Sequence, residues 1–205
     1  MDASKLVTVV IANYKTPQLV RGCFTSLRKV YPTVPVVLVD NGSKDASTEY
    51  IKARASKDVN VLAILNPSNL GHGPALHLGV LASHTPYVFT LDSDCAVLRR
   101  KFLEGMLEVA LSSPETYAIG WLRFAGKAIE QVHPWGMLID ASMYLTLAPF
   151  IHGPRPAAPN MFSARAQGLK LVDFPISTFI KHKAQGTRRL FPGRPWDPTE
   201  IGKHS

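Results

Sequence analysis

Two acidic residues one position apart, Asp92 and Asp94, are the residues of this chain best suited to chemistry. They occur in the run Leu91-Asp92-Ser93-Asp94, directly after the apolar stretch 87–90, which predicts a buried strand. Hard divalent cations prefer oxygen ligands, and ions such as Mg²⁺ are commonly shared between one or two carboxylates and substrate phosphates. The pair therefore indicates a site for a metal-bound diphosphate, whereas an isolated pair of this kind could also cap a following helix.

The first half of the chain alternates between strand patterns and helical patterns. A β-branched run at 6–11 predicts a strand that is covered on both faces, and Pro17 opens a helical pattern. The alternation continues with strands at 34–39, 59–65 and 86–91 and with helices at 46–55, 73–82 and 100–111. This order predicts an α/β fold in which a mostly parallel central sheet is flanked by helices.

Polar turns follow three of these strands: Ala12-Asn13-Tyr14, Asp40-Asn41-Gly42 and Asp92-Ser93-Asp94. Ligands of such sheets bind beyond the carboxyl ends of the strands, so we expect the three turns to form one rim. Asp40 also has a simpler interpretation, since it could merely cap a turn whose Asn and Gly tolerate a positive φ.

The bulk properties describe a globular chain with a basic C-terminal part. A chain of 205 residues can bury one good core, and no apolar run reaches the length of a membrane-spanning helix. Cys23 and Cys95 predict buried, reduced thiols, and the first residues lack the pattern of a signal peptide, so we expect a cytoplasmic protein.

Residues 151–205 hold 9 Lys and Arg against 3 Asp and Glu, a net charge of +6 that suits either solvent or an anionic membrane surface. No nucleic-acid motif accompanies this charge, so no nucleic-acid partner is expected.

The pattern changes after residue 112, where proline is frequent and clear periodicity is lost. Short strands are predicted at 117–124, 169–172 and 176–180, and residues 191–198 should lack regular structure. The cluster His133-Pro134-Trp135-Gly136 stands out here, because a Trp beside a His could stack on a sugar ring, although Trp135 could equally fill the core.

Four segments together resemble the inverting family-2 glycosyltransferases, which have the GT-A fold. In chain order they are VVIANY at 9–14, VLVDNGS at 37–43, NPSNLG at 66–71 and LDSD at 91–94. The resemblance implies one continuous GT-A domain, with a nucleotide-sugar-binding half at 1–112 and an acceptor-binding half at 113–205. It also implies an enzyme that transfers a sugar with inversion and depends on Mn²⁺ or Mg²⁺.

The resemblance assigns roles to residues at the expected rim. Asp40 would accept a hydrogen bond from the imide N–H of uracil or thymine, because a carboxylate can only accept. Asp94 would bind the metal, with His182 as a further ligand, although His182 could also be a surface histidine between two lysines. Arg188 and Arg189 could meet the diphosphate, although both could equally be exposed to solvent. The remaining nucleotide-binding residues would be Ala12, Asn13, Tyr14, Asn69, Gly71, Asp92 and Ser93.

The catalytic base is where this chain departs from the family. The family usually has an acidic pair in the region that corresponds to 152–160 here, and this chain has no carboxylate there. An inverting transfer needs a base within reach of the acceptor hydroxyl. Asp140, which follows an apolar run, and His152, whose ordinary pKa suits base chemistry near neutrality, are the two candidates. Asp140 could instead be the N-cap of a helix that begins at Ala141.

These observations favour a metal-dependent inverting hexosyltransferase that uses a UDP- or dTDP-sugar and a saccharide or lipid-linked acceptor. The basic C-terminal region would allow peripheral contact with a membrane that carries such an acceptor. One alternative is a catalytically silent domain that binds a nucleotide-sugar or a partner. Another is a sugar-phosphate nucleotidyltransferase, which ranks lower because residues 13–17 lack the glycine-rich loop of those enzymes.

Overall fold

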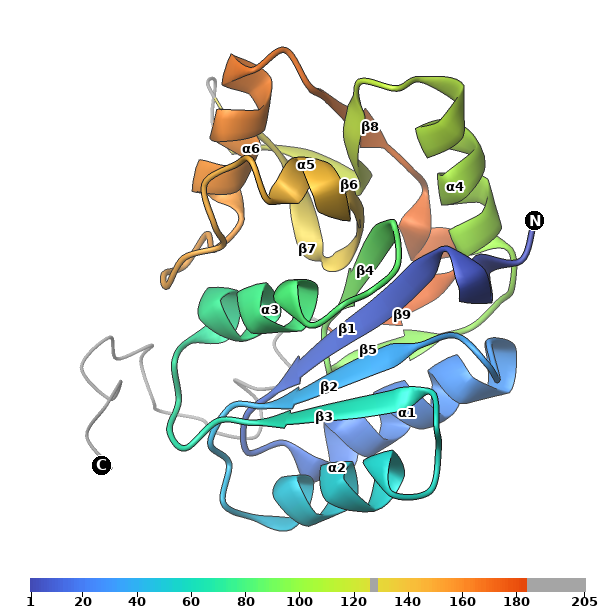
Figure 1. Ribbon diagram of the computed structural model, residues 1–205, viewed down its shortest axis with the longest axis vertical. Helices are drawn as coiled ribbons and strands as arrows, with labels where there is room; N and C mark the ends of the chain where they lie inside the picture. Colours follow the sequence, from blue (N-terminus) through green and yellow to red (C-terminus); the bar gives the residue numbers. More distant parts are fainter. Residues whose placement is uncertain (126–128, 184–205) are drawn as a thin grey trace.

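In the computed structural model, which describes residues 1–125 and 129–183, a seven-stranded sheet with the order β3-β2-β1-β4-β7-β6-β8 separates two layers of helices (Figure 1). The first four strands are parallel to one another, β7 is antiparallel to both of its neighbours, and β8 is parallel to β6. The strands are β1 Val7–Asn13, β2 Val36–Asp40, β3 Val61–Leu65, β4 Tyr87–Leu91, β6 Thr116–Ala125, β7 Ile129–Asp140 and β8 Lys170–Asp173.

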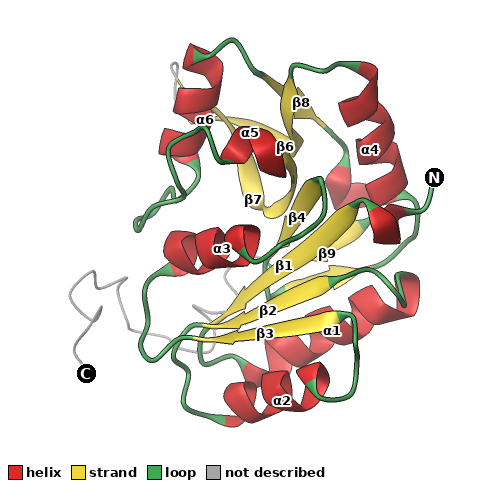
Figure 2. Cartoon of the chain, viewed as in Figure 1, coloured by secondary structure: helices red, strands yellow, loops and turns green. Residues whose placement is uncertain are grey.

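Helices cover both faces of the sheet, as the colouring by secondary structure shows (Figure 2). On one face lie α1 Pro17–Val30, α2 Ala46–Ala55 and α4 Phe102–Ser112; on the other lie α3 His72–Leu81, α5 Ala141–Tyr144 and α6 Ala158–Ala166. Alternate residues of each central strand enter the two cores: in β1, Val9 and Ile11 face α1, whereas Val10 and Ala12 face α3. Burial on both faces explains why these strands are continuous apolar runs.

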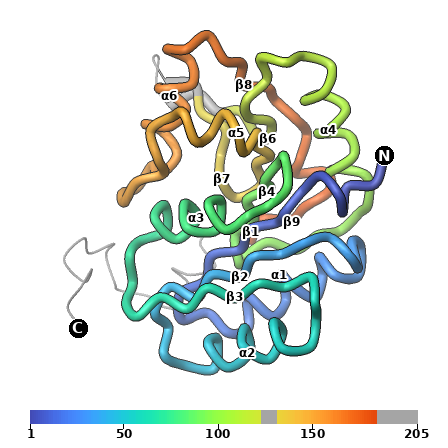
Figure 3. The backbone as a smooth tube through the Cα atoms, in the orientation of Figure 1, coloured from blue at the N-terminus to red at the C-terminus, as the bar shows by residue number. Residues whose placement is uncertain are grey.

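A second, two-stranded sheet brings the end of the described chain back to its middle. Strand β5, Cys95–Val97, pairs antiparallel with β9, Ile180–His182, so that Cys95 lies opposite His182. The backbone trace shows β9 returning to the N-terminal half of the molecule (Figure 3). The pairing carries His182 to the residues that follow β4.

The predicted α/β architecture is confirmed, and the differences lie in the second half. The segment 176–180, predicted as a strand, forms a 3₁₀ turn at Ile176–Thr178, and pairing begins only at Ile180. Strand β7 was not anticipated, because Pro134 interrupts its pattern and cannot donate to a sheet. The segment 191–198 lies outside the described residues, as do Arg188 and Arg189. Within the described part of the chain, no helix is long and apolar enough to cross a membrane.

Candidate nucleotide and metal site

The three predicted turns lie at one edge of the sheet. Asn13 and Asp40 are register partners at the ends of β1 and β2, and Asp92 directly follows β4 on the other side of β1. The parallel strands therefore deliver Asn13, Asp40 and Asp92 to neighbouring positions at their carboxyl ends, as the sequence predicted.

The side chain of Asn41 joins two of the rim loops. Its Nδ2 donates to Asn69 Oδ1 (2.7 Å) and to the Gly71 carbonyl (3.1 Å), and its Oδ1 accepts from Asn66 Nδ2 (3.0 Å) and Leu70 N (3.1 Å). Asn69 Oδ1 also accepts from Gly71 N at 2.9 Å. The amides of Asn41 and Asn69 thus hold the loop in shape, and Asn41 is a positioning residue that was not predicted.

Gly71 has a conformation that suits few other residues. Its φ is +92°, and a Cβ at this position would lie 2.2 Å from Nδ1 of His152. His152 therefore packs directly against the loop that precedes α3, so the structure brings this predicted residue to the rim.

The first turn of the rim has its polar side chains engaged within the protein. Asn13 Oδ1 accepts from Thr16 Oγ1 at 2.5 Å, and Asn13 Nδ2 lies 3.4 Å from Ser43 Oγ, which also accepts from Lys15 N. Asn13 and Ala12 are buried, whereas Tyr14 is half-buried. Asn13 therefore shapes the turn, and Tyr14 is the residue of this turn with a side chain open to a ligand.

Asp40 is a buried carboxylate that uses one oxygen within the protein. Only 2 % of the residue is exposed, and Oδ2 accepts from Thr48 Oγ1 at 2.6 Å. Among the described residues, Oδ1 is buried and has no hydrogen-bond donor. A buried acceptor without a donor costs free energy, so this site favours a ligand that presents an N–H.

Acidic and imidazole side chains from three segments form a cluster beyond the end of β4. His182 Nε2 lies 3.2 Å from Asp94 Oδ1 and 3.9 Å from Asp92 Oδ2. On the other side, His72 Nε2 lies 3.2 Å from Asp92 Oδ1. His72 begins α3 and was not predicted, although its place directly after Asn69-Leu70-Gly71 is the sequence signal that could have identified it. Neither aspartate caps the next helix, because the N-cap of α4 is Lys101.

The pKa values at this cluster shift as expected for paired acids and imidazoles. The hydrogen bond to Asp94 raises the pKa of His182. Partial burial favours neutral His72, but the neighbouring Asp92 carboxylate outweighs it and raises the pKa of His72. Burial likewise opposes ionisation of Asp92, and the charge of His72 overcomes it and lowers the pKa of Asp92. The Asp92 carboxylate is therefore available as an anionic group at neutral pH.

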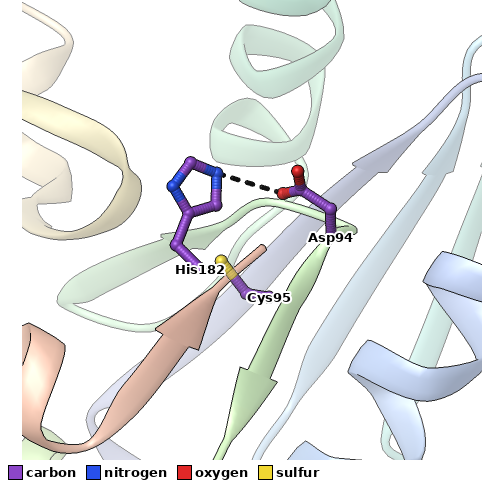
Figure 4. Close-up of side chains that lie close together, drawn as sticks. All are labelled: Asp94, Cys95 and His182. Carbon is purple, nitrogen blue, oxygen red and sulfur yellow. Dashed lines mark ion pairs between the residues drawn. The ribbon is translucent and has the colours of Figure 1, made fainter. Parts of the chain in front are cut away.

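Asp94, Cys95 and His182 place one potential ligand atom each within 4.8 Å of one another (Figure 4). The carboxylate fits Mn²⁺ or Mg²⁺, which prefer oxygen donors, and the imidazole adds a nitrogen donor that fits Mn²⁺ better than Mg²⁺. The sulfur fits less well, because burial raises the pKa of the Cys95 thiol and Sγ donates to the Trp135 carbonyl at 3.5 Å. Of these three residues, Asp94 and His182 are therefore the ones whose chemistry fits a metal ion.

Asp140 lies away from this site. It is paired with Tyr87, at the amino end of β4, and its carboxylate is the N-cap of α5, accepting from Ser142 N (2.8 Å) and Met143 N (2.9 Å). The hypothesis that Asp140 is the catalytic base is therefore not retained, because the length of β4 separates it from Asp92. The alternative interpretation from the sequence, a helix N-cap, describes what is observed.

Comparison with solved structures defines the class of the fold. The chain superposes on the mannosyltransferase PcManGT of Pyrobaculum calidifontis, solved with GDP-Man and Mn²⁺, with a TM-score of 0.68 and 15 % identity, covering 82 % of this chain and 54 % of that chain. It superposes on residues 1–349 of S. aureus TarS with UDP-GlcNAc with a TM-score of 0.61 and 13 % identity, covering 78 % and 53 %. The chain has the GT-A fold and spans about half the length of these proteins.

Residues 8–155 match the family described as "Glycosyl transferase family 2", and the chain belongs to that family. An uncharacterized glycosyltransferase of Haemophilus influenzae is 26 % identical over 179 residues, which cover 87 % of this chain and 68 % of that protein. The undecaprenyl-phosphate 4-deoxy-4-formamido-L-arabinose transferase of Pseudomonas paraeruginosa is 36 % identical over 94 residues, 43 % of this chain and 28 % of that protein. The predicted family is thereby confirmed.

Proposed function

We propose that this protein is a metal-dependent inverting glycosyltransferase whose donor is a UDP- or dTDP-sugar. The choice of nucleobase rests on the buried Asp40 carboxylate, whose Oδ1 has no hydrogen-bond donor among the described residues. Uracil and thymine present an imide N–H that a carboxylate can accept, as guanine does at N1, whereas the corresponding ring nitrogens of adenine and cytosine are acceptors. The solved relatives carry GDP-Man or UDP-GlcNAc, so nucleotide-sugar binding itself is common to the fold neighbours.

Asp94 and His182 are the residues that would hold Mn²⁺ or Mg²⁺. When bound, the metal would supply positive charge that offsets the charge developing on the departing diphosphate. Asp92 lies between His72 and His182, and both imidazoles hold its carboxylate in place. The adjacent Ser93 is buried at the same turn, and we propose that Asp92 and Ser93 contact the donor on the ribose side.

His152 is our candidate for the general base of the transfer. It packs against Gly71, one residue from His72, and thus lies at the rim from which Asp140 is absent. A neutral imidazole could accept the proton of an acceptor hydroxyl as that oxygen attacks the sugar. A His152→Gln variant should then retain donor binding and lose most of kcat; retained kcat would exclude His152 as the base.

The acceptor that we propose is a saccharide or a lipid-linked saccharide. One relative is a transferase whose name specifies undecaprenyl phosphate, which motivates the lipid-linked alternative. The basic residues of the segment 151–205 would support peripheral membrane contact of a cytoplasmic protein, and those after residue 183 lie beyond the part described by the structure.

The test is a calorimetric titration with UDP, dTDP, GDP and ADP, each with and without Mn²⁺. We expect metal-dependent binding of UDP or dTDP that is tighter than binding of ADP, and the GDP titration tests whether the site also takes a purine that presents a ring N–H. An Asp40→Ala variant should lose the preference for UDP and retain the metal dependence. Absence of nucleotide binding to the wild-type protein would exclude the proposed donor site.

A second candidate function is donor binding without transfer. It is favoured by the engagement of the described carboxylates of the acceptor half: Asp140 caps α5, Glu115 pairs with Lys170, and Asp173 accepts from Leu122 N. Detection of free UDP from UDP-sugars, in the presence and absence of saccharide acceptors, separates the two functions. Donor binding without any UDP release would favour the silent domain.

A further inference from the structure

A series of aromatic rings leads from the metal site to the surface. The imidazole of His182 stacks on Trp135, with ring centroids 5.1 Å apart and planes 7° apart. Trp135 makes an edge contact with Trp121 at 5.9 Å, and Trp121 stacks on His133 at 5.5 Å. Trp135 is 3 % exposed, whereas Trp121 is 41 % exposed. The first of these tryptophans supports a metal ligand, and the second offers ring surface to solvent.

An irregularity between β6 and β7 produces this arrangement. Between the register pairs Gly120↔Met137 and Leu122↔Val132, β6 contains Trp121 alone, whereas β7 contains the segment 133–136. The longer segment leaves the regular pairing, and Pro134 at its centre needs no ladder hydrogen bond. Strand bulges re-aim side chains and are common next to active sites. Here the bulge places the ring of Trp135 against His182 and the ring of His133 against Trp121.

The bulge is tied to the metal-binding turn and to the neighbouring strand. The Trp135 carbonyl accepts from Asp92 N at 3.2 Å, which connects the aromatic series to the acidic turn. Leu122 N donates to Asp173 Oδ1 at 2.9 Å, which fixes the backbone directly after Trp121. A side chain at Gly120 could not be accommodated, because a Cβ there would lie 2.7 Å from the Gly136 carbonyl oxygen. Trp121 is thus held at a defined position.

The strand order places Trp121 on the side of the metal site opposite to the nucleotide pocket. Asp40 ends β2, the acidic turn follows β4, and Trp121 lies on β6, in a sheet whose order is β3-β2-β1-β4-β7-β6-β8. A donor that spans from Asp40 to Asp94 therefore leaves the β6 side for the second substrate. Indole surface with an adjacent carboxylate, here that of Asp173, suits a sugar ring, which has an apolar C–H face and polar hydroxyl groups.

We propose that Trp121 is the stacking platform for a saccharide acceptor, held in place by the bulge of β7 and by Asp173. This inference rests on the proposed function, because it names the site of the second substrate of that reaction. Two ring contacts separate Trp121 from His182, so a sugar stacked on Trp121 lies within a short saccharide's length of the metal ligands.

The experiment uses saturation-transfer NMR on the full chain with UDP and Mn²⁺ present. The probes are methyl glycosides of glucose, galactose, mannose and N-acetylglucosamine and the disaccharides cellobiose and chitobiose. Trp121→Ala should weaken binding of the responding saccharide about tenfold, the size expected for loss of one stacked aromatic ring. Trp121→Phe should restore much of the binding. Phe162→Ala, which removes an exposed ring on α6, is the matched control and should change nothing.

UDP affinity, measured by calorimetry on the same samples, separates the two possible failures. UDP binding that is unchanged in Trp121→Ala, with saccharide binding reduced, supports the platform. Equal saccharide binding by the wild-type and Trp121→Ala proteins overturns it, as does UDP binding without any saccharide response in the wild-type protein. Loss of the proposed function has a different signature, namely that neither UDP nor dTDP binds the wild-type protein.

Discussion

The strand pair β4–β7 carries an acidic residue at each end, and the two ends have different roles. At the carboxyl end of β4, Asp92 lies between His72 and His182, with Asp94 on the far side of His182. At the amino end of β4, Asp140 caps a four-residue helix and accepts from the backbone of Ser142 and Met143. The two ends are about 15 Å apart at the usual rise per strand residue.

The difference shows that the role of a carboxylate depends on the edge of the sheet at which it lies. The carboxyl edge gathers the turns that follow β1, β2 and β4, so polar groups from separate segments meet there. The amino edge receives the connections that enter these strands, and among the described residues the Asp140 carboxylate accepts hydrogen bonds from the first turn of its own helix. We therefore expect substitutions at the carboxyl edge to affect ligand binding and those at the amino edge to affect stability alone.

The largest expected effect distinguishes the two edges directly. Asp94→Ala removes a proposed metal ligand and should weaken Mn²⁺-dependent UDP binding more than about 100-fold, since loss of an outer-shell partner alone typically costs 10–100-fold. Asp140→Ala is the matched control and should bind UDP as the wild-type protein does. Calorimetry with and without Mn²⁺ measures both. Normal metal-dependent binding by Asp94→Ala would remove Asp94 from the site.

Two glycines with nearly equal, positive φ angles provide the next comparison. Gly42, in the rim turn, and Gly168, which precedes β8, have φ values of +77° and +78°. A Cβ on Gly42 would lie 2.4 Å from the backbone of Ser68, whereas a Cβ on Gly168 would have no atom within 4 Å. Gly168→Ala should cost about 1 kcal/mol of unfolding free energy from strain alone, and Gly42→Ala about 3 kcal/mol or more.

Urea unfolding of the two glycine variants measures this difference. The rim turn should also lose its alignment with the 66–71 loop, so Gly42→Ala should bind UDP more weakly at a temperature where it remains folded. Equal stability of the two variants would show that the rim backbone adapts to a side chain at position 42.

A smaller effect is expected for the cap at Asp140. Asp140→Ala should lower the unfolding free energy by about 1 kcal/mol, because the first backbone N–H groups of α5 lose their acceptor. Asp140→Asn should retain most of the stability, since Asn caps nearly as well. Thermal unfolding measures both variants. A loss of turnover in Asp140→Asn, with stability unchanged, would contradict a purely capping role.

The smallest effect is expected at Cys95, which lies beside the proposed metal ligands Asp94 and His182. Its thiol has a raised pKa because of burial, so it should not coordinate Mn²⁺ near neutral pH. Cys95→Ala should keep the Mn²⁺ affinity within about twofold of wild type, the scale of an indirect packing effect rather than the loss of a ligand. His182→Ala is the contrasting variant and should lose most of the Mn²⁺ affinity. A large loss of Mn²⁺ affinity in Cys95→Ala would make the sulfur a ligand.

Much of the first half could be predicted because its signals are local. The helix predicted at 46–55 has those bounds in the structure, and the strand predicted at 86–91 is observed at Tyr87–Leu91. The second half was harder, because α6 and β7 are stabilised by packing and by irregular pairing that leave weak periodicity. Pro134 disfavoured a strand in the sequence, but in the structure it lies in the bulge of β7, where no ladder hydrogen bond is needed.

The sequence by itself determined the family, the alternation of strands and helices, and the meeting of the Asn13, Asp40 and Asp92 turns at one edge. These follow from residues close together in the chain and from the geometry of parallel sheets. Only the tertiary structure decided which distant residues join that edge. It placed His72 and His182 beside Asp92, kept Asp140 away, and brought Trp121 outward through the bulge of β7. The physical reason is that register, strand direction and bulges are set by long-range pairing, which no local pattern of residue types records.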